Sequence, residues 1–320
     1  TYFMVDQLLL KDDVANLQYG AIQAFVYAFT FIGGIFADKI LGFKKSLFFG
    51  GMVMILGNLL IAIAPKDMFY YGIAFSIIGT GFFKPNVSSM VGELYHEDDP
   101  RRDAGYGMFY AGINIGGFLG GILCIYLGKY YSWQLCFLAS AIVMVLGLLT
   151  FLFTKNKLGP IGNSPLSHLP KTKRLTKEIL VYALSLLSIP LIFIMVKNTD
   201  YTDYFMYTIG IIAIAYFLFE VFKIGELSAQ KKIIAAFVFI FFYVLFNAIY
   251  EQSGGSLSLF AKYNLNDKLL GLTIDPNAVN NSSNTLFVII LSPLIGLLWV
   301  WLANKKIEPN TLIKFGIGFL

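Results

Sequence analysis

Charge is what this sequence lacks most. Asp, Glu, Lys and Arg together make up only 13% of its 320 residues, against about 25% in soluble globular domains. Hydrophobic residues make up 57% of the chain, and the mean hydropathy is +0.70. These values exclude an ordinary water-soluble domain, and we expect a membrane protein.

Residue patterns that carry chemistry are missing as well. The sequence has no H-E-x-x-H metal motif, no phosphate loop of the Walker type and no nucleophile elbow. We therefore expect neither an enzyme nor a bound metal or organic cofactor. The only cysteines, Cys124 and Cys136, lie in or beside apolar runs without the spacing of metal ligands. We interpret both as small buried hydrophobic residues.

What the chain has in abundance is apolar runs of the length that crosses a bilayer as a helix, about 20 residues. The runs do not alternate with period two, which excludes a transmembrane barrel. We expect an all-α polytopic membrane protein that begins and ends within a helix. Partial helices are expected at 1–10 and from 311, and complete spans at 19–37, 46–64, 68–92, 104–128, 133–153, 178–197, 204–223, 231–260 and 284–303.

The net charge of +5 does not indicate a nucleic-acid partner, because the basic residues gather in short loops between apolar runs. With the loop at 37–46 on the cytoplasmic side, alternating spans put most lysines and arginines on that side, as the positive-inside rule requires. A polar segment with three prolines and many cations, 155–177, is the predicted linker between domains. It follows a first helical bundle at 1–154, whose first helix is partial, and we expect it to be cytoplasmic.

Lys84 lies far inside an apolar run, in "GFFKPNVSS" at 81–89. A lysine at mid-bilayer depth costs about 2.5–3.5 kcal/mol on insertion scales, so it normally faces a cavity or an anionic partner. In the alternative interpretation the span is shorter and the side chain reaches the headgroups, or Glu93 is a structural partner. Because Pro85 and Asn86 follow, we expect the helix to break there and to line a polar cavity.

Glu251 is the second charge within an apolar stretch. If its helix runs from 231 to 260, this carboxylate lies deep in the bilayer and can hold a proton near neutral pH. Alternatively the helix ends at Tyr250 and Glu251 is interfacial. Asn114 is a third polar candidate, set among glycines that permit close helix packing. It either joins helices or contacts a ligand amide.

Several stretches resemble one transporter family. "GGIFADKILGFKKS" at 33–46 resembles the loop motif of the major facilitator superfamily, and its spacing is similar to that of the proton-dependent oligopeptide transporters. The resemblance continues through "GFFKPNVSS", "DDPRRDAGYGMFYAGINIGGFLG", "YEQSGGSLSLFA" and "SNTLFVIILSPLIGLLW". It implies the superfamily fold, two six-helix bundles, with two inserted helices at 178–224 and the start of the C-terminal bundle at 225–320. Relative to that plan, we expect the chain to be truncated at both ends.

The resemblance also implies roles for individual residues. Lys84 would meet the carboxylate of a peptide, Glu251 would carry the coupling proton, and Asp38 with the cations Lys39, Lys44 and Lys45 would bridge helices at the cytoplasmic side during gating. Tyr19, Tyr27, Asn114 and Asn284 match further substrate-binding positions, although Thr285 stands where the family usually has proline after the last of these.

The function implied is import of di- and tripeptides with protons, by alternating access, in the cytoplasmic (inner) membrane, with no cofactor beyond the coupling protons. The partners would be the peptide, protons and the lipid bilayer, and no nucleic acid. Other anionic substrates, such as nitrate, a drug or an amino acid conjugate, remain open, as does a membrane receptor that transports nothing.

Overall fold

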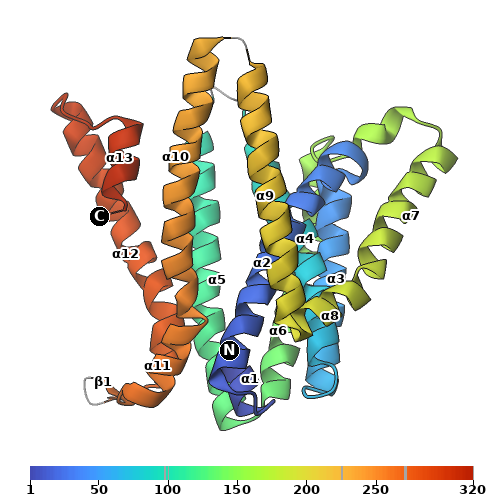
Figure 1. The fold of residues 1–320 in the computed structure, drawn as a ribbon, viewed down its shortest axis with the longest axis vertical. Coiled ribbons are helices and arrows are strands. Elements are labelled where there is room, and N and C mark those ends of the chain that lie inside the picture. The colour runs from blue at the N-terminus through green and yellow to red at the C-terminus, as the bar shows by residue number, and fades with distance from the viewer. Residues whose placement is uncertain (97–98, 100, 225, 270–271, 320) are drawn as a thin grey trace.

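The computed structural model describes residues 1–96, 99, 101–224, 226–269 and 272–319. Its architecture is a set of long helices that run alternately up and down between the two ends of the molecule (Figure 1). Strands occur in the described part only as a short antiparallel pair, β1 (Lys268–Leu269) and β2 (Leu272–Thr273). The expected all-α membrane fold is confirmed, and the small ribbon is an addition that the apolar pattern did not predict.

The first half of the chain forms one closely packed bundle. Its core contains large side chains from α2, α3 and α4, among them Phe25, Phe29, Val53, Ile77 and Phe82. The elements are α1 (Tyr2–Asp6), α2 (Asp12–Phe36), a π-helical turn η1 (Ala37–Leu41), α3 (Phe43–Ile63), α4 (Phe69–Glu93), α5 (Arg102–Tyr130) and α6 (Trp133–Thr154).

Eight helical stretches of the described chain are long and apolar enough to cross a membrane. The sequence led us to expect nine, and the helix that does not qualify by hydropathy is α4. This helix carries Lys84 and Asn86 and packs between α2 and α3. A helix enclosed by other helices does not have to match the lipid, so it can be more polar than its neighbours.

The predicted break at Pro85 is wrong, because α4 continues as one helix from Phe69 to Glu93. Proline removes the donor that would bond the carbonyl of Gly81. That carbonyl instead lies against Gly33 of α2, where an added Cβ would come within 2.2 Å of the Gly81 oxygen. One residue on, the side-chain amide of Asn86 donates to the carbonyl of Phe82 at 2.7 Å. Close packing and this amide hold the helix together across the proline.

The linker and the inserted helices are packed onto the first bundle. The linker contains two short 3₁₀ turns, η2 (Lys155–Leu158) and η3 (Pro165–His168). The helix predicted at 178–197 begins earlier, at Lys171 after Pro170, and is divided into α7 (Lys171–Leu187) and α8 (Ile189–Lys197) with Pro190 in the first turn of α8. Ile192 and Val196 of α8 are buried in the core of the first bundle. The second inserted helix is α9 (Thr199–Lys223).

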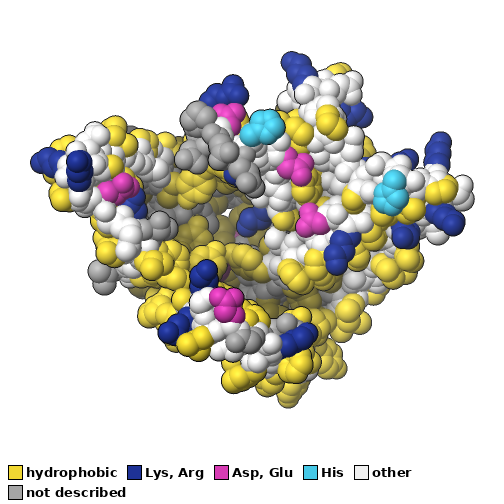
Figure 2. Space-filling model, turned by 90° about the horizontal axis from the view of Figure 1, so that it is seen from above, with side chains coloured by type: hydrophobic (Ala, Val, Ile, Leu, Met, Phe, Trp, Pro, Cys, Tyr) yellow, Lys and Arg dark blue, Asp and Glu magenta, His cyan; other side chains and the backbone are white. Residues whose placement is uncertain are grey.

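The last part of the chain contains α10 (Leu227–Tyr250), a 3₁₀ turn η4 (Glu251–Ser253), α11 (Ser256–Asn264), α12 (Pro276–Asn304) and α13 (Thr311–Ile317). Helix α12 packs along α5 of the first bundle. The C-terminal ends of α2, α6, α9 and α12 lie at one end of the molecule, the upper end in Figure 1. We call it the basic end, because Lys44, Lys45, Lys155 and other cations lie there. Seen from this end, the molecule is hollowed near its centre; a few Lys and Arg side chains lie beside the hollow, and most lie farther out (Figure 2).

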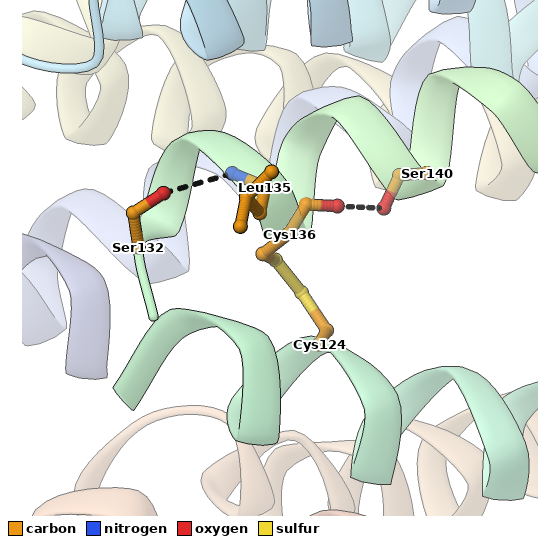
Figure 3. Close-up of a disulfide and its surroundings, with 5 residues drawn as sticks. All are labelled: Cys124, Ser132, Leu135, Cys136 and Ser140. Carbon is orange, nitrogen blue, oxygen red and sulfur yellow. Dashed lines mark hydrogen bonds between the residues drawn. A yellow bond between two sulfur atoms is a disulfide. The ribbon is translucent and has the colours of Figure 1, made fainter. Parts of the chain in front are cut away.

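Cys124 of α5 and Cys136 of α6 form a disulfide (Figure 3). We interpreted both as small buried hydrophobic residues, which holds for Cys136 at 1% exposure, while Cys124 is half-buried and the pairing was not predicted. The two helices are antiparallel neighbours joined by a tight turn at Tyr131 and Ser132, which places both thiols at the same depth. They lie toward the end opposite the basic end.

Candidate functional site

Glu251 lies at a break in a transmembrane helix. The α-helix ends at Tyr250, as the interfacial interpretation of the sequence required, but the chain continues through η4 and resumes as helix at Ser256. The break accommodates α2, because a Cβ on Gly254 would lie 2.2 Å from the hydroxyl of Tyr19. A discontinuous helix exposes polar groups in the middle of a bundle, where ion and substrate sites of transporters occur.

Three side chains of α2 donate hydrogen bonds to the Glu251 carboxylate. The Tyr27 hydroxyl donates to Oε1 at 2.8 Å. The Gln23 amide and the Tyr19 hydroxyl donate to Oε2 at 2.8 and 3.2 Å. The Gln23 amide also lies 2.7 Å from the Tyr19 hydroxyl. The arrangement satisfies an ionised carboxylate, which accepts through both oxygens.

Sequence analysis identified Tyr19 and Tyr27 but missed Gln23. The signal was present, since Tyr19, Gln23 and Tyr27 follow one another at intervals of four on a helix and therefore share one face. A polar stripe of this kind on an otherwise apolar span predicts a partner with several acceptor sites. Glu251 supplies them.

Lys84 projects toward the same tyrosine from α4. Its ammonium lies 5.5 Å from the centre of the Tyr27 ring, a cation–π distance. Lys84 is exposed rather than buried, and within the described residues it has no carboxylate within ion-pair distance, Glu93 included. Tyr27 thus contacts a cation through its ring and an anion through its hydroxyl.

A cavity of about 680 Å³ borders Glu251 on the side of the inserted helices. Tyr19, Gln23 and Tyr27 line it from α2, and Thr202, Asp203 and Met206 line it from α9. Its size is in the range of small-molecule sites. The contribution of α9 was not predicted, because nothing in the local sequence at 199–206 shows which neighbour the helix contacts.

The two predicted asparagines have different surroundings. Asn284 of α12 donates to the hydroxyl of Tyr250 at 3.1 Å, next to Glu251 in the chain. Asn114 of α5 is buried and donates to the carbonyl of Tyr110 in its own helix at 2.8 Å. The structure therefore brings Asn284 to the vicinity of the Glu251 site, while the described bonds of Asn114 are local to α5.

The predicted gating residues do not form one cluster. Lys44 donates to the Gly159 carbonyl at 2.6 Å and to Oδ1 of Asn163 at 3.1 Å, both in the linker. Lys45 pairs with Glu178 of α7 at 2.5 Å. Asp38 and Lys39 lie in the π-helical turn, are exposed, and have no ion pair within the described part of the chain. In this conformation Lys44 bonds to the linker and Lys45 to α7, and neither pairs with Asp38.

No group of three or more His, Cys, Asp or Glu residues suited to a metal ion occurs among the residues that the structure describes. The polar groups around Glu251 are phenols and an amide. The arrangement is suited to binding a charged ligand and moving a proton.

The comparison with known proteins agrees with the sequence resemblance. The family model described as "POT family" matches residues 44–320. The chain is 34% identical over 306 residues to the uncharacterized transporter YclF of Bacillus subtilis, covering 94% of this chain and 61% of that protein. It is 30% identical over 319 residues to dipeptide and tripeptide permease A of Proteus mirabilis, covering 99% of this chain and 64% of that protein.

Solved structures show the same fold. A mutant of a peptide transporter POT in complex with alafosfalin superposes with a TM-score of 0.81 at 30% identity, covering 99% of this chain and 66% of that one. The peptide transporter POT in complex with sulfate gives a TM-score of 0.79 at 30% identity, with the same coverage. This chain thus spans less than two thirds of the length of these relatives. The family-model match over residues 44–320 and the relatives at 34% and 30% identity show that the chain belongs to the POT family.

Proposed function

We propose that this chain forms the substrate- and proton-binding part of a symporter that imports di- and tripeptides together with protons by alternating access. The observation that carries the proposal is the placement of Lys84 and Glu251 on either side of Tyr27. The ammonium of the first bundle lies over the ring of Tyr27, and the carboxylate of the broken helix accepts a hydrogen bond from the hydroxyl of the same residue. Lys84 and Glu251 are also unusual because charged residues are rare within the apolar stretches of this chain.

Peptides suit this pair of charges. A free peptide carries a carboxylate and an ammonium, and each is costly to desolvate unless an opposite charge receives it. Lys84 lacks an ion-pair partner among the described residues, so its ammonium is available to the peptide carboxylate. Recognition through the termini leaves the peptide side chains free to vary.

Coupling to protons would follow from the hydrogen bonds of Glu251. In the conformation seen here the carboxylate is satisfied by Tyr19, Gln23 and Tyr27. Protonation of Oε1 gives Glu251 a donor of its own, which turns the hydroxyl of Tyr27 from donor to acceptor. Because the ring of Tyr27 also lies beside Lys84, protonation of Glu251 would change the position of Tyr27 and thereby the surroundings of the lysine that binds the peptide carboxylate.

The names of relatives support the proposal: one is a dipeptide and tripeptide permease, and one structure is a peptide transporter in complex with alafosfalin.

We place the protein in the cytoplasmic membrane with the basic end and the linker on the cytoplasmic side, since lysines and arginines favour that side. The hollow in that end (Figure 2) would then be the inward-facing path of the substrate.

Uptake of labelled dialanine into proteoliposomes tests the proposal. We expect an inward proton gradient to drive accumulation in the wild type and Lys84→Ala to abolish it, while Lys66→Ala, a change of the same kind in an exposed loop, leaves it intact. Glu251→Gln should lose gradient-driven accumulation yet keep counterflow exchange. Absence of peptide uptake by folded wild type would refute the substrate class and leave another anion as the cargo.

A further inference from the structure

A second cavity lies at the basic end, away from Glu251. Its volume is about 890 Å³, and it is lined by α3, α6, the linker and α7. The wall on α7 is formed by Tyr182, and the wall on the linker by residues between Gly159 and Ser164. Helix α7 and the linker therefore complete a site that the first bundle alone would leave open.

The lining residues are ordered by depth. Lys44, Phe48 and Met52 follow one another at intervals of four on α3 and so share one face. Lys44 is in the first turn of this span, and Met52 lies about 12 Å deeper along the helix axis. On α6, Phe151 lies one turn deeper than Lys155. The lysines thus lie toward the basic end of the cavity, and aromatic and thioether groups line the part nearer to the middle of the helices.

Two of the ammonium charges toward the basic end of the cavity are not balanced by a carboxylate. Among the described residues, Lys44 bonds to neutral oxygens, those of Gly159 and Asn163, and to no carboxylate. Lys155 has no ion pair within the described ranges. Lys45 differs, since it pairs with Glu178. The cavity therefore carries a net positive charge beside an apolar wall.

We propose that this cavity binds an anionic phospholipid, with the phosphate between Lys44 and Lys155 and the start of an acyl chain along Phe48, Met52 and Phe151. Basic pockets between transmembrane helices at the membrane surface are suited to phosphate headgroups. A soluble anion would use the lysines but leave the apolar wall uncovered. The bound lipid would connect α3 and α6 to the linker and α7. This inference does not depend on the peptide-transport proposal.

Native mass spectrometry of the purified protein, titrated with phosphatidylglycerol or with zwitterionic phosphatidylcholine, tests this site. We expect the wild type to retain phosphatidylglycerol preferentially. Lys44→Gln with Lys155→Gln should weaken its binding roughly thirtyfold, since a lysine near an anionic lipid surface contributes about fivefold. The matched control is Lys171→Gln with Lys173→Gln, which removes two exposed cations of the same end that do not line the cavity. Equal losses in both pairs would overturn the proposal.

A second variant tests the apolar wall without changing charge. Met52→Trp narrows the apolar part of the cavity and should weaken lipid binding, whereas Phe153→Trp, on an 82% exposed side chain outside the cavity, should not. Competition identifies the source of the phosphate. If inorganic phosphate or the headgroup glycerophosphoglycerol displaces the lipid at comparable concentration, the acyl chain contributes nothing and a soluble anion, not a lipid, is the ligand.

Discussion

The hydroxyl of Tyr27 donates to Oε1 of Glu251 at 2.8 Å, and this bond joins α2 to the break that follows α10. The same side chain lies under the ammonium of Lys84 at 5.5 Å. A single phenol therefore contacts the two charges on which the proposed function depends. A mutation that removes the hydroxyl and keeps the ring can separate the contributions of these two contacts.

Tyr27→Phe keeps the ring beside Lys84 and removes the donor to Glu251. A hydrogen bond to a charged group contributes about 1.5–3 kcal/mol, so we expect proton-driven accumulation of dialanine to fall roughly ten- to a hundredfold. Counterflow exchange should fall much less, because the cation that meets the peptide is unchanged. Both rates are measured in the same proteoliposomes.

Tyr71→Phe is the control for this change. Tyr71 is a similarly exposed tyrosine on α4, stacked on Phe193, and its hydroxyl has no hydrogen bond within the described part of the chain. The Tyr71→Phe variant should accumulate and exchange dialanine at the rates of the wild type. An equal decrease of driven uptake and exchange in Tyr27→Phe would contradict a role in coupling and indicate a role in binding.

The charges of the site could be predicted from the sequence because charge is rare in apolar spans. Lys84 and Glu251 are conspicuous for that reason, and the structure brings both into contact with Tyr27. Gln23 could have been found from its spacing relative to Tyr19 and Tyr27. The last residues of most helices lie within two residues of those predicted, because apolar runs of membrane length have clear limits. The starts were predicted less well: α2, α7, α9, α10 and α12 begin four to eight residues earlier than expected, in polar sequence that precedes the apolar run.

Other features depend on contacts that the sequence does not display. Whether α4 breaks at Pro85 is decided by Gly33 of a neighbouring helix and by the amide of Asn86. Pairing of Cys124 with Cys136 requires the relative rotation of α5 and α6. The attachment of Lys44 and Lys45 to the linker and α7 likewise reflects packing between segments distant in sequence.

Loss of the disulfide should destabilise the α5–α6 pair. The cysteines are 12 residues apart, and the chain-entropy model gives about 3 kcal/mol for a loop of that order. We expect a reductant to lower the thermal unfolding midpoint of the wild type but not that of Cys124→Ala with Cys136→Ala. Unfolded wild type should take up maleimide at both thiols only after reduction. Labelling without reductant would show that the bond is absent.

The close crossing of α2 and α4 predicts a sharp difference between two adjacent glycines. A Cβ at Gly33 would lie 2.2 Å from the oxygen of Gly81 and 2.9 Å from the nitrogen of Phe82, whereas a Cβ at Gly34 meets nothing within 4 Å. Overpacking of this kind costs about 1–3 kcal/mol or more. Gly33→Ala should therefore lower the unfolding midpoint, and Gly34→Ala should maintain or raise it. Equal midpoints would show that the helices are farther apart.

At the end opposite the linker, the ammonium of Lys129 on α5 pairs with Oδ2 of Asp275 at 2.6 Å. Asp275 is the N-cap of α12, where its Oδ1 accepts from the backbone amides of Asn277 and Ala278. The ion pair thus joins the first bundle to the start of α12 and closes this end. Lys129→Met should favour separation of the two helices by about 1–2 kcal/mol, or roughly five- to thirtyfold in the ratio of open to closed forms.

Electron-spin distance measurements between labels at the exposed positions Tyr131 and Asn266 follow this separation. We expect longer distances in Lys129→Met and unchanged distances in Lys197→Met, which removes an exposed lysine at the end of α8. Asp275→Asn removes the charge but keeps a good N-cap residue, so it should open this end without unwinding α12. Because both substitutions remove one shared bond, the double variant should open it no further than either alone. Additive effects would mean that Lys129 and Asp275 act separately.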